Sequence, residues 1–336
     1  MQRTVQYDAH HYPHPKTQQK RLERAVLEHL NRHRLLRAVD LAAAVAPERP
    51  FDAAMSAVQR QLARLIDERC VQRTVIAHIT CYALTARGAH RLGEYRAADS
   101  EHPPAPWRSW SDVRPGARRL GDRTNPAHSL QISQIVIAAE ARGFTAWTEA
   151  ELRTQLKRPP LVVDDGGERR GLWPDALALI PMGSTHHLCW IEIDRSRRGS
   201  QRLADLAALV RSAGQPVRVP DAEEAMPLRR ISVLTATPSI ARADITHLEE
   251  RVTVGFAGDS ALSKREEGLF DVRADVEQRL PDGRTQIVRQ TAARLVIQPW
   301  TEPTPITWFD AQALPWRVQS GAWPPAQPVK FCGASI

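Results

Sequence analysis

Acidic residues in the second half of the chain recur in a pattern that suits metal-dependent chemistry. Asp175 follows a proline in one β-like run, and 17 residues later a Glu-x-Asp triplet in the next run supplies Glu192 and Asp194. This interval suits a hairpin, and alternation along a strand points Glu192 and Asp194 to one side, within reach of Asp175. A third acidic element is Glu149 or Glu151, at the start of a predicted helix.

Carboxylates that crowd together repel one another and lose hydration, so a core strand seldom holds several without compensation. A hard divalent cation is the usual compensation, because Mg²⁺ (or Mn²⁺) takes oxygen ligands. We therefore expect Asp175, Glu192 and Asp194 to hold such an ion, with a bound water that attacks a phosphodiester. The alternatives are that Asp175 is only a strand start, and that Arg195 or Arg197 neutralises the two strand carboxylates as surface ion pairs.

The two acidic residues of the predicted helix start have different expected roles. Thr148-x-x-Glu151 is a capping-box pattern, in which the side chain of the fourth residue returns to the backbone N–H of the first. We therefore expect Glu151 to be structural. Glu149, one position into the helix, is then the better candidate for a catalytic role.

This order of residues resembles the PD-(D/E)XK nuclease superfamily, with a helix Glu, then Pro-Asp on one strand and Glu-x-Lys on the next. The resemblance implies a restriction-endonuclease-like α/β fold and phosphodiester hydrolysis, with Asp175, Glu192, Asp194 and Glu149 as catalytic residues. The match is partial, since the usual lysine position is Asp194. That lysine normally positions or activates the water.

The chain also resembles the replication-relaxation family of plasmid and mobile-element proteins, over about residues 20–250. The motifs that carry the resemblance are, in order, YALTARGAHRL, HSLQISQIVIAAEARGF, WTEAELR, WPDALALI and WIEIDRS. In that family the last motif typically reads Glu-x-Asp, as it does here. The resemblance implies DNA binding linked to replication, relaxation or transfer, with other proteins of a mobile element as partners.

The net positive charge comes entirely from the first part of the chain. The formal net charge is +8, and residues 1–125 contain 21 Lys and Arg against 13 Asp and Glu, whereas the remainder contains 25 of each. A basic segment joined to a neutral one indicates that one end of the chain meets a polyanion. The alternative is a basic surface that serves only solvation.

The basic part has the element order of a winged helix-turn-helix. Helices are predicted over residues 17–33, 36–45 and 51–69, followed by β-like runs over 71–77 and 79–84 and by a helix that Thr85 caps. The third helix would enter the major groove of double-stranded DNA, with the two strands as the wing. The residues expected to contact DNA are Gln59, Arg60 and Arg64 on the helix and Arg73 and His78 on the wing. A winged helix used for protein contacts is the alternative.

The fold class is α/β (α+β overall) in five parts. We expect a flexible arm (1–16), a winged helix (17–96), a Pro-rich linker (97–125), a restriction-endonuclease-like α/β domain (126–255) and a β/irregular, Trp- and Pro-rich C-terminal extension (256–336).

Several function classes lack their sequence signals. The chain has no glycine-rich nucleotide-binding loop, no G-x-S-x-G elbow and no run of about 20 apolar residues that would span a membrane. No apolar signal segment opens it and its four cysteines form no C-x-x-C pair, so a reducing cytoplasm is expected. Two hypotheses result: a Mg²⁺-dependent DNA endonuclease or nickase, and a catalytically silent DNA-binding accessory factor or transcriptional regulator.

Overall fold

The chain is a mixed α/β protein that divides into two compact units. The structure, a computed structural model, describes residues 15–46, 49–76, 79–98, 126–141, 144–165, 168–182, 185–194, 199–220, 222–254, 259–266, 268–279 and 284–299. One unit comprises Met1–Ala46 with Asp52–Arg123, and the other comprises Pro47–Phe51 with Thr124–Ile336. Within the described ranges, eight helices and a large mixed sheet form, and none of these helices has the length and apolarity to cross a membrane.

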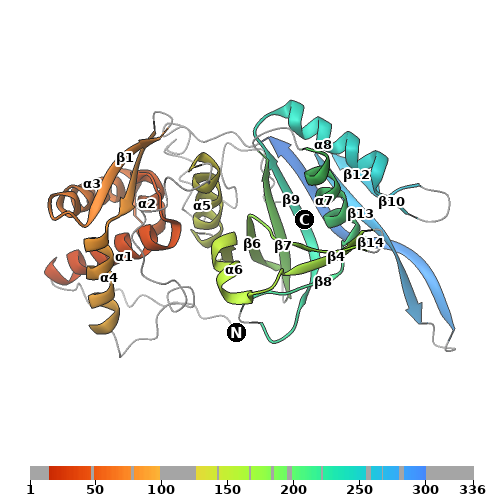
Figure 1. The fold of residues 1–336 in the computed structure, drawn as a ribbon, viewed down its shortest axis with the longest axis horizontal. Coiled ribbons are helices and arrows are strands. Elements are labelled where there is room, and N and C mark those ends of the chain that lie inside the picture. The colour runs from red at the N-terminus through yellow and green to blue at the C-terminus, as the bar shows by residue number, and fades with distance from the viewer. Residues whose placement is uncertain are drawn as a thin grey trace. The chain divides into compact units, whose positions relative to one another are not determined.

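The first unit contains four helices and one antiparallel hairpin. In chain order these are α1 (Pro15–His33), α2 (Ala38–Val45), α3 (Phe51–Asp67), β1 (Val71–Ile76), β2 (Ile79–Leu84) and α4 (Ala86–Ala98), drawn red to orange in Figure 1. The predicted apolar stripe of α3 is confirmed at its centre, where Val58, Leu62 and Leu65 are buried. These side chains recur every three or four residues, so one face of α3 is buried and the other is left to solvent.

The start of α4 is fixed by a short polar network. The Thr85 hydroxyl lies 2.7 Å from the Arg69 carbonyl oxygen and 3.0 Å from that of Cys70, and it accepts a hydrogen bond from the Gly88 N–H at 3.1 Å. Thr85 therefore caps α4, as predicted. Gly88 packs against the Cys70 carbonyl because it has no side chain.

The second unit is built on one mixed sheet. Its elements are α5 (Pro126–Ala141), β3 (Thr145–Thr148), α6 (Glu149–Leu156), β4 (Leu161–Asp165), β5 (Glu168–Leu172), β6 (Ala176–Met182), β7 (Thr185–Asp194), α7 (Ser200–Arg211), β8 (Pro216–Val217), β9 (Met226–Thr235), α8 (Pro238–Arg251), β10 (Thr253–Val254), β11 (Asp259–Ser260), β12 (Leu262–Glu266), β13 (Leu269–Arg279) and β14 (Thr285–Pro299). The strand order is β12-β13-β14-β9-β7-β6-β3, with β8 beside β9. β7, β9 and β14 are parallel to one another, whereas β3, β6 and β7 form antiparallel pairs.

Side-chain alternation gives the two faces of β7 different neighbours. Cys189, Ile191 and Ile193 face α5 and form a core with its Ile135 and Val136. The alternate side chains, Trp190, Glu192 and Asp194, face the side of α7. Helices therefore cover both faces of the sheet, with α5 on one side and α7 and α8 on the other (Figure 1).

The sheet continues beyond the predicted α/β domain. Residues from 256 onward were expected to form a β/irregular extension. Strands do form there: β14 pairs in parallel with β9, β13 pairs with the other edge of β14, and β12 pairs with β13, so they extend the same sheet. Sequence analysis missed this because the pairing joins strands far apart in the chain. Of the predicted arm (1–16), residues 1–14 lie outside the described residues, while Pro15 and Lys16 begin α1. Residues 99–125 of the predicted linker (97–125) and the Trp- and Pro-rich residues 300–336 also lie outside them.

Two of the four cysteines lie buried in the first unit as free thiols. These are Cys70 and Cys81, and burial raises the pKa of Cys81 to about 11. The expectation of a reducing compartment stays a prediction.

Two glycines of α4 test the packing of this helix. A methyl group at Gly88 would overlap the Cys70 carbonyl oxygen and lie 2.8 Å from Leu84 Cδ1, whereas nothing lies within 4 Å of a methyl group at Gly93. We expect Gly88→Ala to lower the free energy of unfolding by about 1–3 kcal/mol. Gly93→Ala should raise it by up to about 1 kcal/mol through helix propensity. Urea denaturation followed by circular dichroism measures both, and equal stabilities would contradict this packing.

Candidate functional site

The hairpin of β6 and β7 brings the predicted acidic residues together. Ala176 pairs with Ile191, and the Asp175 N–H donates to the Ile191 carbonyl oxygen at 3.1 Å, so Asp175 lies opposite Glu192. Asp175, Glu192 and Asp194 all line one pocket of about 300 Å³. The predicted juxtaposition of these three residues therefore occurs, at the carboxyl end of β7.

Both carboxylate oxygens of Asp175 are hydrogen-bonded. Oδ1 lies 2.9 Å from Nε2 of His128, in the first turn of α5, and Oδ2 accepts the Ile193 N–H at 2.7 Å. Asp175 thus joins the start of α5 to the end of β7. These contacts hold the carboxylate in one orientation at the wall of the pocket.

The other two strand carboxylates differ in exposure. Glu192 is partly exposed, and its Oε1 accepts a hydrogen bond from the Trp190 indole at 2.7 Å. Asp194 is only 2% exposed. Although both residues line the pocket, only Glu192 presents a substantial part of its side chain to solvent.

Basic and aromatic residues complete the pocket. Arg153 of α6 stacks on the Trp173 ring, with 4.4 Å between the guanidinium carbon and the ring centroid. Arg202 of α7 also lines the pocket and is exposed. Asp205, from the same helix, pairs with Arg170 at 3.1 Å. The pocket therefore combines oxygen ligands with guanidinium groups, which bind phosphate well.

The expected metal centre is not assembled from three ligands. Among the residues that the structure describes, no three His, Cys, Asp or Glu side chains are grouped so as to hold a metal ion. Asp175 already has two donors, from His128 and Ile193. As placed, these side chains do not fit a closed Mg²⁺ or Mn²⁺ site.

Glu149 and Glu151 occupy different places at the start of α6. Glu151 completes the predicted capping box, since its Oε2 accepts the Thr148 N–H at 2.8 Å. The Glu149 carboxylate accepts a hydrogen bond from Arg153 at 2.7 Å, and Glu149 is not among the residues that line the pocket. Its connection to the pocket is therefore indirect, through Arg153.

Sequence analysis missed four ionisable residues of the pocket: His128, Arg153, Arg202 and Asp205. Two of these lie inside the motifs that carry the family resemblance, His128 at the start of HSLQISQIV and Arg153 at the end of WTEAELR. The available signal was therefore the motif itself. Spacing alone could not show that the first turn of α5 meets the end of β7.

The DNA contacts predicted on α3 and the hairpin differ in their surroundings. Gln59 and Arg60 are exposed on α3, and Arg73 is exposed on β1. His78, predicted on the same hairpin, lies outside the described residues. The structure therefore leaves three of the predicted contact residues at the surface.

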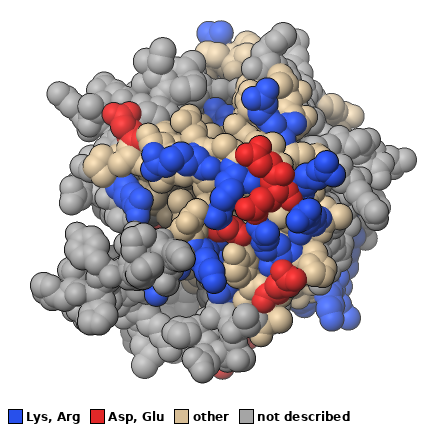
Figure 2. All heavy atoms as spheres, turned by 90° about the vertical axis from the view of Figure 1, so that its left-hand side faces the viewer, with Lys and Arg blue, Asp and Glu red and all other residues tan. Residues whose placement is uncertain are grey.

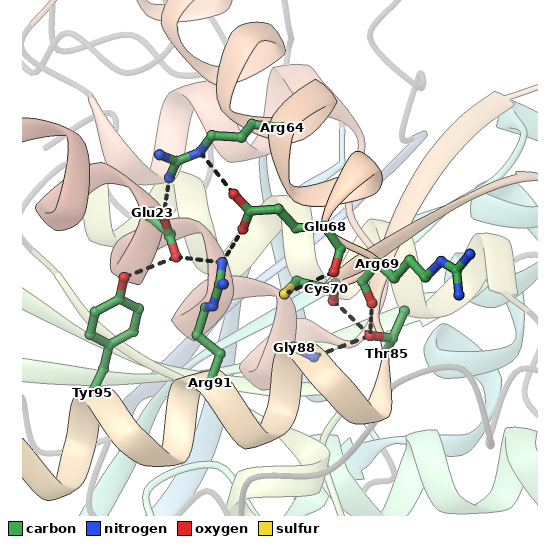
Figure 3. Close-up of polar contacts among 9 residues, drawn as sticks. All are labelled: Glu23, Arg64, Glu68, Arg69, Cys70, Thr85, Gly88, Arg91 and Tyr95. Atoms are coloured by element: carbon green, nitrogen blue, oxygen red, sulfur yellow. Dashed lines mark hydrogen bonds and ion pairs between the residues drawn. The ribbon is translucent and has the colours of Figure 1, made fainter.

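Arg64 takes part in an ionic network of the first unit, and its side chain is 34% exposed (Figure 3). Its guanidinium pairs with Glu23 of α1 and lies 3.9 Å from Glu68. Arg91 of α4 bonds both carboxylates, and the Tyr95 hydroxyl donates to Glu23 at 2.9 Å. The prediction of Arg64 as a DNA contact overlooked this structural role, because sequence spacing on one helix does not show which side chains of other helices face it.

The network shifts the pKa values of two of its members. Burial and the hydrogen bond to Glu23 raise the pKa of Tyr95 to about 12. The hydrogen bond to Glu68 raises the pKa of Arg91. Glu23, which is buried, thus has three donors from α3 and α4.

Basic side chains also lie on the surface of the molecule. Figure 2 shows the face at the left-hand side of Figure 1, where Lys and Arg side chains surround a smaller group of Asp and Glu. The basic residues of the first unit whose side chains are exposed include Lys20, Arg21, Arg60, Arg69, Arg73 and Arg87. Such a distribution can attract a polyanion.

No family model, curated protein or solved structure matches the chain.

The two facing carboxylates of the pocket should differ in their contribution to stability. Asp175→Ala removes the acceptor of the Ile193 N–H, and we expect a loss of about 1–3 kcal/mol in the free energy of unfolding. Glu192→Gln keeps an oxygen for the Trp190 indole and should change it by less than about 0.5 kcal/mol. Urea denaturation near neutral pH measures both. An equal loss in the free energy of unfolding for Glu192→Gln would contradict the stabilising role assigned to the bond between Asp175 and Ile193.

Proposed function

We propose that this chain is a double-stranded DNA-binding protein whose first unit is a winged helix. In this proposal α3 is the recognition helix and the β1–β2 hairpin is the wing. Support comes from the order α1-α2-α3-β1-β2 and from the antiparallel pairing of the hairpin. The restriction of net positive charge to residues 1–125 supports a polyanionic partner.

The observation that carries the proposal is the division of α3 into two faces. Val58, Leu62 and Leu65 are buried, while Gln59 and Arg60 are exposed. Gln and Arg are the side chains that bond adenine and guanine edges in the major groove through two hydrogen bonds. Within a basic unit, a helix that presents this pair outward favours DNA over a protein partner.

The resemblance to the replication-relaxation family extends this proposal to a biological setting. We propose a role in the replication, relaxation or transfer of a plasmid or mobile element, with other proteins of that element as partners. Two features of the second unit agree with it: the Glu-x-Asp motif ends β7, and Asp175 lies opposite it. The motifs of the resemblance run from the end of the first unit, at β2 and α4, to the end of β7 in the second unit. The proposal therefore concerns both units.

Binding of a fluorescent DNA duplex, measured by anisotropy, tests the recognition helix. Arg60→Ala should weaken binding about tenfold or more, since one lost contact to a base edge costs about 1–3 kcal/mol, and it should leave the free energy of unfolding unchanged. Arg87→Ala removes an exposed arginine on α4, outside α3 and the β1–β2 hairpin. It controls for the loss of one surface charge and should weaken binding much less than Arg60→Ala. Equal affinities for the two variants would refute the assignment of α3.

Phosphodiester cleavage in the second unit is a second candidate function. It is favoured by the meeting of Asp175, Glu192 and Asp194 with two arginines in one pocket. Arginines of this kind would hold a phosphate, and carboxylates would orient water beside it. The competing view is that the pocket is catalytically silent and that the chain acts through binding alone.

Incubation of supercoiled plasmid with the protein and Mg²⁺ separates these two views. If the pocket cleaves DNA, the wild type should produce open circles and Glu192→Gln should not, because the variant removes one charge from the pocket while keeping the bond to Trp190. Agarose gel electrophoresis reads out the conversion, and EDTA tests the dependence on a cation. Equal nicking by both proteins, or none by the wild type, would favour the accessory factor.

A further inference from the structure

The last two strands of the second unit run on together beyond the other strands of the sheet. Among the described residues, β14 pairs with β9 only through Arg294–Pro299, and β12 pairs with β13 only through residues 269–272. Farther out, residues 273–279 and 285–291 pair with each other and with no third strand of the described ranges (Figure 1). We call this part the ribbon. A two-stranded ribbon is marginally stable by itself in water, because each strand has one edge without hydrogen-bond partners.

A β-bulge lies where the ribbon leaves the sheet. The register of β13 and β14 shifts between Val272 and Arg273, so that Ala292 is the extra residue of β14. Ala292 and Ala293 are buried, and the Ala292 carbonyl oxygen accepts a hydrogen bond from Arg229 of β9 at 3.2 Å. The base of the ribbon is therefore packed within the second unit, and the exposed part of β14 begins directly before the bulge.

The edge of β14 that faces away from β13 lacks the usual protection against another strand. Residues 285–291 are exposed apart from the half-buried Val288, and Ile287 is 65% exposed. Natural proteins blunt such edges with charged side chains or proline. This segment has one charged residue, Arg289, and its guanidinium bonds Asp275 of β13 at 3.1 Å. A further strand can therefore add to this edge.

The sequence of this edge segment reads almost the same in both directions, as TQIVRQT. When two identical segments pair antiparallel about a two-fold axis, residues at equal distances from the centre lie opposite each other. With the central valine on the axis, Thr285 lies opposite Thr291 of the second copy. Gln286 likewise lies opposite Gln290. Threonine pairs and glutamine pairs hydrogen-bond across strands, so the segment is complementary to itself.

The remaining pair and the charge of the ribbon also favour a second copy. Ile287 would lie opposite Arg289 of that copy, and the aliphatic part of an arginine side chain covers apolar neighbours. Residues 273–291 contain four Arg against three Asp or Glu, so the ribbon is nearly neutral. Binding to nucleic acid depends on an excess of basic side chains, and a protein strand is therefore the better partner for this edge.

We propose that residues 285–291 form a dimerisation edge, at which two copies of this chain pair antiparallel about a two-fold axis at Val288. The two ribbons then join into one four-stranded sheet, with the β14 segments in the middle and the β13 segments outside. Backbone groups that face solvent in one copy are hydrogen-bonded in the dimer. Because the contact is confined to one edge, the interface is small and the dimer dissociates on dilution. The proposal is independent of the proposed DNA binding, which concerns the first unit.

Opposite charges introduced at Ile287 test the dimerisation edge and its register. Within its own ribbon Ile287 pairs in register with Glu277, so Ile287→Lys gains an acidic partner there, but it faces Arg289 of the second copy. Sedimentation equilibrium of the full chain should show a concentration-dependent dimer for the wild type. Ile287→Lys should raise its dissociation constant about tenfold, because two symmetric pairs of like charges form across the edge. Ile287→Glu faces the same arginine with a carboxylate and should bind at least as tightly as the wild type.

Val162→Lys is the matched control, because Val162 of β4 is also an exposed apolar residue, at 51%, and lies outside the ribbon. It should dimerise as the wild type does. A wild type that stays monomeric at every concentration would overturn the proposal, and so would equal effects of lysine and glutamate at Ile287. Tighter binding of a DNA duplex by Ile287→Lys, with no dimer of the wild type, would assign the ribbon to nucleic acid instead.

Oxidative cross-linking tests the position of the axis without a charged variant. Val288→Cys places two cysteines directly opposite each other, at a Cα separation of about 4.5–5.5 Å that a disulfide can span. Non-reducing gel electrophoresis should show a covalent dimer for Val288→Cys and none for Gln286→Cys, whose opposite residue is Gln290. The wild type, oxidised in parallel, controls for the native cysteines. Equal yields of covalent dimer from the two variants would refute the register.

Discussion

Cross-strand register is the constraint on which the second unit depends. The pairing of Ala176 with Ile191 places Asp175 opposite Glu192, and the pairing of Arg230 with Arg294 places two like charges face to face. Because side chains alternate with a period of two, a slip of one residue would send each of these groups to the other face. Register is specified here by the buried side chains of β6, β7 and β9. Ile191, for example, packs against α5.

In the first unit, a buried carboxylate has the comparable role. Glu23 has donors from α3 and α4, and a buried charge without partners would be costly. The network that satisfies it engages the Arg64 guanidinium, whereas Arg60, one turn earlier on α3, is exposed. The same constraint thus joins three helices.

The two ends of β7 carry opposite chemistry. At its carboxyl end carboxylates gather with His128, and at its amino end His187 adjoins the arginines of β9 and β14.

The sequence by itself determined the elements and their local chemistry: the helices of the first unit, the Thr85 and Thr148 caps, the apolar stripe of α3, and the approach of Asp175 to Glu192 and Asp194. Asp175, predicted inside a strand, lies immediately before β6, and Glu192 and Asp194 lie at the end of the adjacent β7. These depend on periodicity and on contacts a few residues apart, which spacing encodes. Only the tertiary structure decided that His128 bonds Asp175, that Arg64 bonds Glu23, and that β14 joins β9. Each of these contacts joins segments distant in the chain, and their partners are selected by the packing of whole elements, which no local pattern records.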